Sequence, residues 1–273
     1  MKIGINRWTM PGAWSAAKCI QVAADSGFDT LELNLEESGD VRRGMSQHDA
    51  NDLRKLANDT GVGLPSVSCG LGWKYPLSST DDAVQKEGIG VATELLKTAA
   101  WLGADTVLLV PGLVTETVAY DVAYNRSQEA LRQLVPVAAD LGVAIGIENV
   151  WNRFLLSPLE FARYIDELES PSVGAYFDVG NVLVTGYPDQ WIRILGKRIR
   201  KVHVKDFKSG IGNIGGFCNV LNGDVPWART VAALNELGYD GPVTAEVEGY
   251  RVFPELGLRH IAQTLETIFR PNQ

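Results

Sequence analysis

Hydrophobic and polar positions follow a recurring pattern along this chain. A helical stretch rich in Ala and Leu ends at a glycine, and a short run of β-branched residues follows at once. A glycine at that place can adopt the left-handed conformation that closes a helix before the chain turns into a strand. Five copies of the unit put Gly27, Gly61, Gly103, Gly142 and Gly238 in equivalent positions. The repeat predicts parallel strands joined by helical crossovers.

Continued along the chain, the same spacing predicts eight strands, near residues 2–6, 29–34, 63–68, 105–110, 144–148, 173–178, 200–205 and 242–247. Helices fill the gaps, as over 82–102 and 126–141, where apolar residues recur every three or four positions. This alternation over 273 residues predicts an α/β fold, a (β/α)₈ (TIM) barrel that forms a single domain over residues 1–273. A doubly wound open sheet is the alternative.

Composition narrows the expected partners. The chain contains no run of eighteen apolar residues and no secretory segment at its start, so we expect no membrane partner and a cytoplasmic location. A formal net charge of -8 opposes a phosphate backbone, which argues against nucleic acid. Cys19, Cys69 and Cys218 are widely spaced without a CxxC pair, and this predicts reduced thiols rather than disulfides or a zinc knuckle.

Polar residues stand at the ends of the last four expected strands, where barrels place functional side chains. These residues are Glu148, Asp178, His203 and Glu246, one from each strand. Each lies in an apolar run, where a lone charge is costly to bury unless it is paired or bound to metal. Three carboxylates and an imidazole suit one divalent metal, Mn²⁺ or Mg²⁺ first, with Co²⁺ and Zn²⁺ as alternatives. Separate capping, hydrogen-bonding and ion-pair roles would also explain each residue taken alone.

A family resemblance rests on five segments: GIENVWNRF, YFDVGNVLVTGYPDQWIRIL, VHVKDF, LNGDVPW and VTAEVE. They resemble the C-terminal half of the xylose-isomerase-like superfamily of sugar isomerases and epimerases, and within it the ketose 3-epimerases and L-ribulose-5-phosphate (L-xylulose-5-phosphate) 3-epimerases. The resemblance implies that Glu148, Asp178, His203 and Glu246 bind one metal and that the two glutamates also act as catalytic acid and base. It further implies a homodimer or homotetramer.

The resemblance implies an isomerase, a metal-dependent sugar or sugar-phosphate epimerase that inverts C3 of a ketose. A metal chelated by O2 and O3 of the ketose would stabilise an enediolate. Glu148 and Glu246 would then remove and return the C3 proton on opposite faces, which requires carboxyl groups with separated pKa values. The expected partner is therefore a small sugar or sugar phosphate.

Other functions remain open. A hydroxypyruvate-type or inosose-type isomerase, or a dehydratase of the same superfamily, uses a similar carboxylate set, and a non-catalytic sugar-binding barrel is the alternative to an enzyme. DNA-repair endonucleases of the superfamily need a histidine where this chain has Asn181, and they do not suit its negative charge. The chain departs from the free-ketose epimerases at Leu155 and from many relatives at Asn222-Gly223-Asp224.

Residues next to the expected ligands leave two questions. Glu248 competes with Glu246, because residues two apart on a strand face the same way. Lys205 shares the face of His203 by the same rule. It would meet a substrate oxygen or phosphate, or form a salt bridge with Asp206 or Glu248 at the barrel mouth.

Further residues outside the four candidate ligands carry expectations of their own. Asn181 is a candidate sugar contact or a loop cap, and Glu32 either reaches the substrate pocket or forms a structural ion pair. Trp151 is a candidate for an apolar wall against the sugar, with ordinary loop packing as the alternative. The glycine-rich run 209–216 suggests a mobile lid rather than a phosphate loop, because it lacks GK[ST]. His48 and His260 are expected on outer helices.

Overall fold

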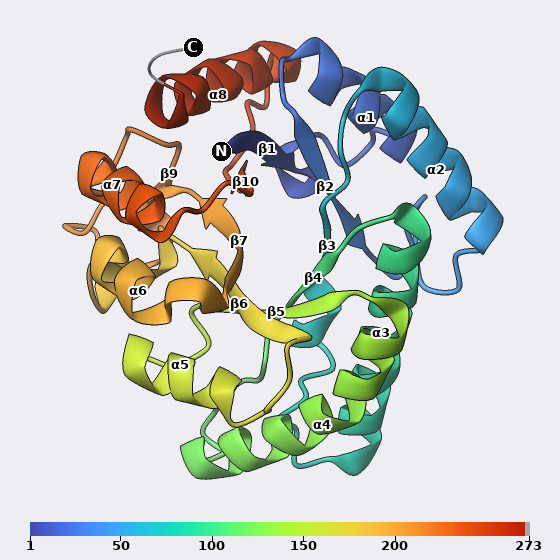
Figure 1. Ribbon diagram of the computed structural model, residues 1–273, viewed down its shortest axis with the longest axis vertical. Coiled ribbons are helices and arrows are strands. Elements are labelled where there is room, and N and C mark those ends of the chain that lie inside the picture. Colours follow the sequence, from blue (N-terminus) through green and yellow to red (C-terminus); the bar gives the residue numbers. More distant parts are fainter. Residues whose placement is uncertain (271–273) are drawn as a thin grey trace.

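Eight parallel strands close into a barrel in the computed structural model, which describes residues 1–270. The barrel strands are β1 (Lys2–Asn6), β2 (Thr30–Leu35), β3 (Ser66–Cys69), β4 (Thr106–Leu109), β5 (Ala144–Glu148), β6 (Val173–Asp178), β7 (Ile199–Val204) and β10 (Pro242–Ala245). Their order is β1-β10-β7-β6-β5-β4-β3-β2, and the last pairs with the first (Figure 1). The predicted TIM barrel is confirmed, and the open-sheet alternative is wrong.

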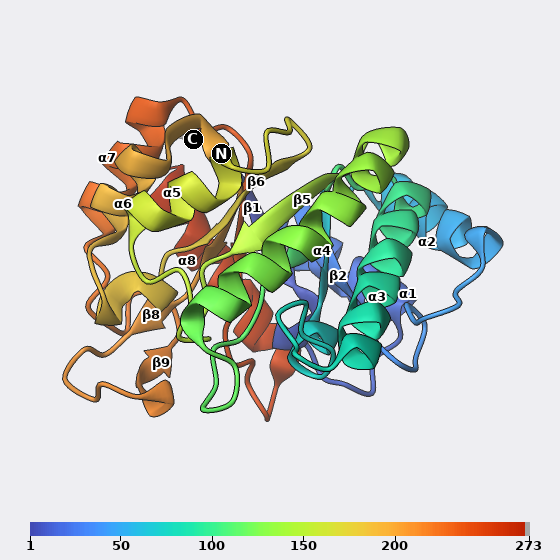
Figure 2. The same ribbon diagram turned by 90° about the horizontal axis from the view of Figure 1, so that it is seen from below.

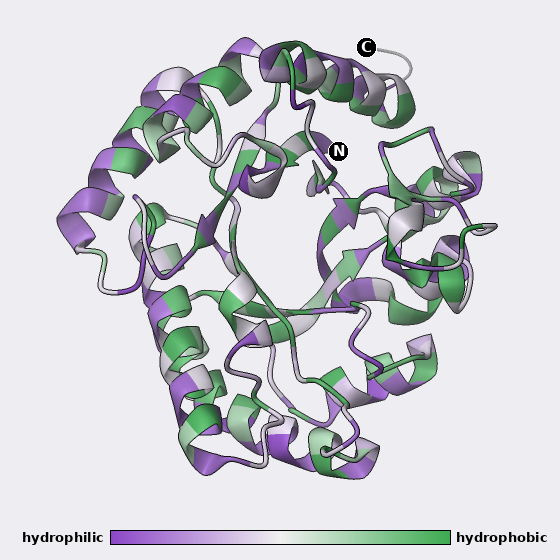
Figure 3. Cartoon of the chain, turned by 180° about the vertical axis from the view of Figure 1, so that it is seen from behind, coloured by the Kyte–Doolittle hydropathy of each residue, from purple (hydrophilic) through white to green (hydrophobic). Residues whose placement is uncertain are grey.

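Helices surround the barrel and alternate with its strands. They are α1 (Ala16–Asp25), α2 (Gln47–Thr60), α3 (Asp82–Leu102), α4 (Tyr120–Leu141), α5 (Pro158–Asp166), α6 (Pro188–Leu195), α7 (Trp227–Leu237) and α8 (Pro254–Phe269). Helix α3 has its predicted bounds, whereas α4 begins six residues before the predicted 126 because Ala123 extends its buried stripe toward the N-terminus. Hydrophobic and hydrophilic residues alternate along the helices (Figure 3).

The repeated glycines close helices as predicted. Each has a positive φ, namely 91° for Gly27, 79° for Gly61 and Gly103, 65° for Gly142 and 71° for Gly238. Other L-residues rarely adopt that region, so glycine at these positions lets the chain leave a helix and turn into a strand without strain.

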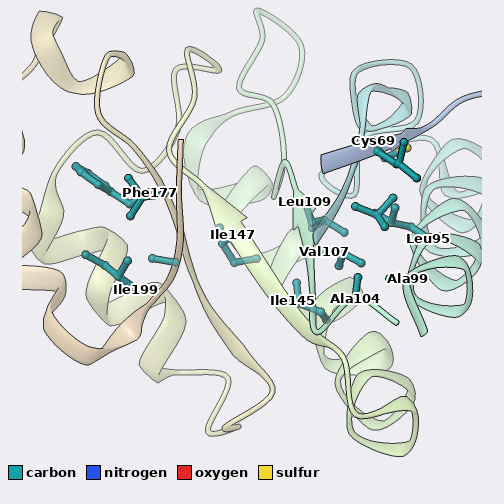
Figure 4. Packing of buried hydrophobic residues seen from close by; sticks show 14 of the residues in the cluster. Cys69, Leu95, Ala99, Ala104, Val107, Leu109, Ile145, Ile147, Phe177 and Ile199 are labelled. Carbon is teal, nitrogen blue, oxygen red and sulfur yellow. The ribbon is translucent and has the colours of Figure 1, made fainter. Parts of the chain in front are cut away.

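Alternate residues of each strand divide between two environments. On β4 and β5, Val107 and Ile145 are fully buried, and Figure 4 shows Val107 near Leu95 of α3 and Ile145 near Ala104. Positions facing the barrel axis carry polar side chains instead, among them the buried Glu32. The apolar layer therefore holds the barrel together, while the axis is left to groups that hydrogen-bond one another.

One short hairpin interrupts the alternation after β7. It consists of β8 (Asp206–Phe207) and β9 (Phe217–Cys218), which pair antiparallel, and the glycine-rich run 209–216 forms its tip. In Figure 2 this hairpin projects on the lower side of the molecule, whereas the N-terminus lies toward the upper side. It thus stands at the end of the barrel where the strands finish.

Several smaller expectations can be placed on the structure. His48 lies in α2 and His260 in α8, as predicted. Cys19, Cys69 and Cys218 are free thiols. Within residues 1–270, no helix is both long enough and apolar enough to cross a membrane.

Candidate metal centre

Four candidate ligands converge at the C-terminal end of the barrel. Glu148, Asp178, His203 and Glu246 each offer one nitrogen or oxygen atom, and these atoms all lie within 4.8 Å of one another. Strand register explains the convergence, since Asp178 of β6 stands opposite His203 of β7. Glu246 follows directly after β10, which ends at Ala245. The three residues within the strands are buried, and the side chain of Glu246 is 21% exposed.

Two buried atoms of this cluster receive no hydrogen bond from the described residues: His203 Nδ1 and Asp178 Oδ2. Buried polar atoms are almost always satisfied, so two unsatisfied ones side by side call for a partner. A divalent cation accepts an imidazole nitrogen and carboxylate oxygens together. The chemistry of the donor set and the two unsatisfied atoms therefore fit a metal ion.

The ring of His203 is held from its other side by Glu32. Glu32 Oε1 lies 2.7 Å from His203 Nε2, and both side chains are fully buried. Glu32 also accepts hydrogen bonds from Ser66 Oγ at 2.5 Å, from Asn6 Nδ2 at 2.5 Å and from the hydroxyl of Tyr176. A carboxylate that accepts the Nε2 proton leaves Nδ1 free to bind metal. Glu32 therefore contacts the His203 ring on the side opposite the nitrogen that is available to a metal.

Lys205 places its ammonium among the carboxylates. Its Nζ lies 2.5 Å from Glu246 Oε2 and 2.9 Å from Asp178 Oδ2, and the side chain is 13% exposed. The Asp178 contact is an ion pair without hydrogen-bond alignment, since Oδ2 has no aligned donor. Lys205 thus provides the positive charge that balances these two carboxylates.

The two glutamates have oppositely shifted pKa values. Burial, reinforced by the negative charge of Glu246, raises the pKa of Glu148 to about 8. Burial also acts on Glu246, but the charges of Lys205 and His203 outweigh it and lower the pKa of that carboxyl. Near neutral pH, Glu148 is therefore protonated and Glu246 ionised within one site.

His203 has a raised pKa. Burial lowers it, but the neighbouring Glu32 carboxylate more than compensates and brings it to about 9. For Glu32 itself, burial raises the pKa, but the charge and hydrogen bond of His203 lower it below the ordinary value. The pair is therefore charged on both sides near neutral pH.

Asn181 joins the ends of β5 and β6. Its backbone N donates to Asp178 Oδ1 at 2.8 Å, and its Nδ2 donates to the carbonyl of Asn149 at 2.9 Å. Asn149 in turn exchanges two hydrogen bonds with the backbone of Asp178, each 2.8 Å long. Asn181 therefore has the contacts of a loop cap that orients Asp178, and its expected contact with a sugar stays a prediction.

Aromatic rings from two segments pack together next to the cluster, and one of them, Phe217, lies beside Lys205. Trp151 follows β5 and packs against Phe207 and Phe217 of the hairpin, with ring centroids 5.2 Å and 4.8 Å apart. Lys205 Nζ lies 5.2 Å from the Phe217 ring centroid. Trp151 Nε1 donates to the carbonyl of Asn181 at 2.9 Å. These contacts are loop packing next to the site, and a sugar wall at Trp151 stays a prediction.

Glu248 does not replace Glu246 in the cluster, and Lys205 does not pair with either of its expected neighbours. The side chain of Glu248 is 78% exposed and pairs with Arg251 at 2.9 Å, so it is not part of the cluster. Lys205 pairs with neither Asp206 nor Glu248 in residues 1–270. Asp206 accepts hydrogen bonds from the backbone of Val225 and from Trp227 Nε1 instead, at 3.0 Å and 2.9 Å.

The two sequence departures have structural roles. Leu155 is buried, and its backbone N donates to the hydroxyl of Tyr120 at 2.9 Å. Gly223 packs so closely on the hairpin that a Cβ there would lie 2.7 Å from the carbonyl oxygen of Phe207. The turn at Asn222-Gly223-Asp224 therefore requires its glycine in order to lie against β8.

Sequence reasoning missed several contributors. Tyr176 lies two residues before Asp178 on β6 and therefore faces the barrel axis with it, a period-two signal that was available in the sequence. Ser66 lies on β3, which carries no expected ligand, and its contact with Glu32 depends on closure of the barrel. Phe217 joins the site only through the hairpin fold.

The fold and this cluster define a (β/α)₈ barrel with a candidate metal centre at the C-terminal ends of its strands. Residues 20–268 match the family model of the xylose isomerase-like TIM barrels. The chain therefore belongs to that family, as the sequence segments predict.

Individual relatives agree with this assignment. The chain is 28% identical over 254 residues to L-ribulose-5-phosphate 3-epimerase UlaE of Escherichia coli (strain K12), covering 90% of this chain and 86% of the relative. A solved D-psicose 3-epimerase with D-tagatose, from Clostridium cellulolyticum H10, is similar with a TM-score of 0.81, at 20% identity over 98% of this chain and 99% of that one. The IOLI protein with a bound zinc atom has a TM-score of 0.83, at 17% identity over 100% and 99% of the two chains. The two structural likenesses show the fold, and the epimerases belong by name to the enzyme class that the sequence predicts.

Proposed function

We propose that this protein is a divalent-metal-dependent sugar or sugar-phosphate epimerase that inverts C3 of a ketose, with Mn²⁺ as the preferred metal. The observation that carries the proposal is the cluster of Glu148, Asp178, His203 and Glu246, whose ligand atoms lie within 4.8 Å of one another. The names of the epimerase relatives support the reaction class, and the zinc atom in the IOLI protein supports a bound divalent metal.

Asp178 and His203 would hold the metal, and Glu148 and Glu246 would hold it and also move the proton. A bound divalent cation supplies Lewis-acid stabilisation of the negative charge that develops on the ketose oxygens. Glu246, kept ionised by Lys205 and His203, is suited to remove the C3 proton. Glu148 would return a proton to C3 from the opposite face. The roles exchange in the reverse direction.

The residues around the cluster would bind and orient the sugar. Lys205 carries the one ammonium that contacts the cluster in residues 1–270, and its Nζ is placed to meet a substrate oxygen or phosphate once a metal takes over Asp178 and Glu246. Trp151 and the hairpin aromatics would exclude water from one side of the bound sugar. Asn181, which already orients Asp178, would supply a further sugar contact.

A panel of ketoses and ketose phosphates with Mn²⁺ in D₂O, followed by NMR, tests this function. L-ribulose 5-phosphate is tested first, because the Escherichia coli relative is named for it. Deuterium that enters C3 together with inversion supports epimerisation. Label at C1 or C2 shows an aldose-ketose isomerase, and absence of exchange with every compound refutes both activities.

We also propose that the protein acts as a homodimer or homotetramer. Support comes from large apolar side chains that the single chain leaves in solvent, including Leu159, Val252 and Phe253 at 72%, 69% and 72% exposure. Light scattering during size-exclusion chromatography tests this directly, and a monomeric mass at micromolar concentration would refute it.

A further inference from the structure

A second region of concentrated charge lies at the opposite end of the barrel from the metal centre. A hollow of about 760 Å³ opens there, below the starts of β1, β4, β7 and β10. Its lining includes the first residues of strands, such as Lys2 and Pro242, and the turns that follow helices, such as Gly103 and Gly238. A hollow of this size is in the range that holds small organic ligands.

Cations dominate this hollow. Five lining side chains are basic, Lys2, Arg54, Lys197, Arg200 and Lys201, whereas two are acidic, Asp105 and Asp240. The local excess of positive charge contrasts with the formal net charge of -8 for the whole chain. Lining by one sign of charge focuses the field inside a concave surface and attracts counter-ions.

Most of these cations have no carboxylate partner. Lys201 Nζ pairs with Asp105 Oδ1 at 2.7 Å, so the charges of these two side chains cancel. Among residues 1–270, Lys2, Arg54, Lys197 and Arg200 form no ion pair within 4.0 Å. By contrast, arginines elsewhere in the chain, such as Arg43 and Arg193, each contact two carboxylates.

Four cations without an ion-pair partner line one hollow and repel one another, and a bound anion would relieve that repulsion. Asp240 is the one acidic lining residue left without a partner, so three net positive charges remain to face a ligand.

We propose that this hollow is a binding site for a small organic anion that carries two phosphate groups, separate from the metal centre. Guanidinium groups hold phosphate oxygens in pairs and ammonium groups act as point charges. Arg54 and the remaining donors of Arg200, whose Nη2 donates to the carbonyl of Pro171, would orient the two phosphates, while Lys2 and Lys197 add attraction. The volume accommodates a ligand of sugar-bisphosphate size. The site is independent of the proposed epimerase activity.

Titration calorimetry with fructose 1,6-bisphosphate, on the full chain in 0.1 M salt, tests the proposal. The test variant is Arg54→Gln/Lys197→Gln, because both side chains are exposed and make no ion pair that their loss would break. The matched control is Lys86→Gln/Arg132→Gln, which removes the same two charges from exposed positions of α3 and α4 outside the hollow. A third protein, Lys205→Gln, removes the cation of the metal centre.

We expect one bisphosphate per chain outside the metal centre, with a dissociation constant below about 1 mM. Affinity should fall at least tenfold in Arg54→Gln/Lys197→Gln, and it should stay within twofold of the parent in the control and in Lys205→Gln. Absence of binding up to 10 mM would overturn the proposal. Binding that is lost in Lys205→Gln, or kept in Arg54→Gln/Lys197→Gln, would overturn it equally, because the ligand would then lie elsewhere.

Discussion

His203 of β7 and Glu32 of β2 contact one another across the barrel axis, with Nε2 2.7 Å from Oε1 and both side chains fully out of solvent. The contact fixes the orientation of the imidazole, so that Nδ1 points to the cluster of carboxylates. Ser66 and Tyr176 hold Glu32 in place in turn. An outer carboxylate of this kind raises the basicity of a metal-bound histidine and restricts its rotation.

Glu32→Gln should therefore weaken metal binding although Glu32 is not a candidate ligand. We expect Mn²⁺ affinity to fall by about 10- to 100-fold, because the amide no longer supports the charge or the orientation of His203. Isothermal titration with Mn²⁺ measures the change. Glu37→Gln is the matched control, since Glu37 is exposed and pairs with Lys74. Equal Mn²⁺ affinities for both variants would show that Glu32 has only a structural role.

Metal affinity should rise steeply with pH. Without metal, Glu148 has a pKa of about 8 and His203 a pKa of about 9, so both hold a proton at pH 6 to 7. Ligation requires the carboxylate and a free Nδ1 lone pair, so binding releases protons and is favoured as pH rises. Two released protons correspond to an increase of up to about a hundredfold per pH unit below pH 8.

Competition titrations with Mn²⁺ at pH 6, 7 and 8 measure this dependence. Proton release is counted separately, by repeating the calorimetry in two buffers that differ in ionisation enthalpy. An affinity that is flat between pH 6 and 8 would contradict the protonation states inferred for Glu148 and His203.

The sequence was sufficient for the fold and for the four candidate ligands because both depend on local patterns. Helix-closing glycines at Gly103 and Gly142, each followed by a short apolar run, reveal the βα units without knowledge of how they pack. A polar residue at the end of such an apolar run, such as Asp178, can also be recognised from the sequence alone. Closure of the barrel then brings these strand ends together.

The partners of those ligands depend on distances that the sequence does not contain. Glu32 was left between a substrate contact and an ion pair, because its histidine partner lies 171 positions away and comes from the opposite part of the barrel. Lys205 was left between a substrate contact and a salt bridge with Asp206 or Glu248, but its ammonium reaches Asp178 and Glu246 at the ends of the two adjacent strands. These ion pairs depend on the length and direction of the side chains, which the order of the strands does not determine.

Lys205→Met should separate the two functions of this lysine. In the metal-free protein it leaves Asp178 and Glu246 without their cation, so we expect a loss of about 3–5 kcal/mol of unfolding free energy. Mn²⁺ should restore most of that loss, because the metal replaces the missing charge, and Mn²⁺ affinity itself should increase. Thermal unfolding with and without Mn²⁺ measures both effects. A variant as stable as the parent without metal would show that the ion pairs are weak.

The eighth strand offers the sharpest test of the catalytic assignment, because Glu246 and Glu248 are two residues apart and chemically identical. Only Glu246 reaches the cluster, whereas the side chain of Glu248 is 78% exposed and pairs with Arg251. Once a substrate is known, Glu246→Gln should lower kcat by at least about a thousandfold, since the amide cannot accept the C3 proton. Glu248→Gln should leave kcat within about twofold, because exposed ion pairs contribute little.

Glu148→Gln completes this comparison. Its amide keeps the size of the carboxyl group but has no acidic proton to return, so C3 inversion should fall by a similar factor. Wash-in of solvent deuterium at C3 without inversion should persist in this variant if Glu246 alone removes the proton, and NMR in D₂O detects it. Loss of wash-in together with inversion, at saturating Mn²⁺, would show that Glu148 is needed to remove the proton as well, and the division of roles between the two glutamates would then be wrong.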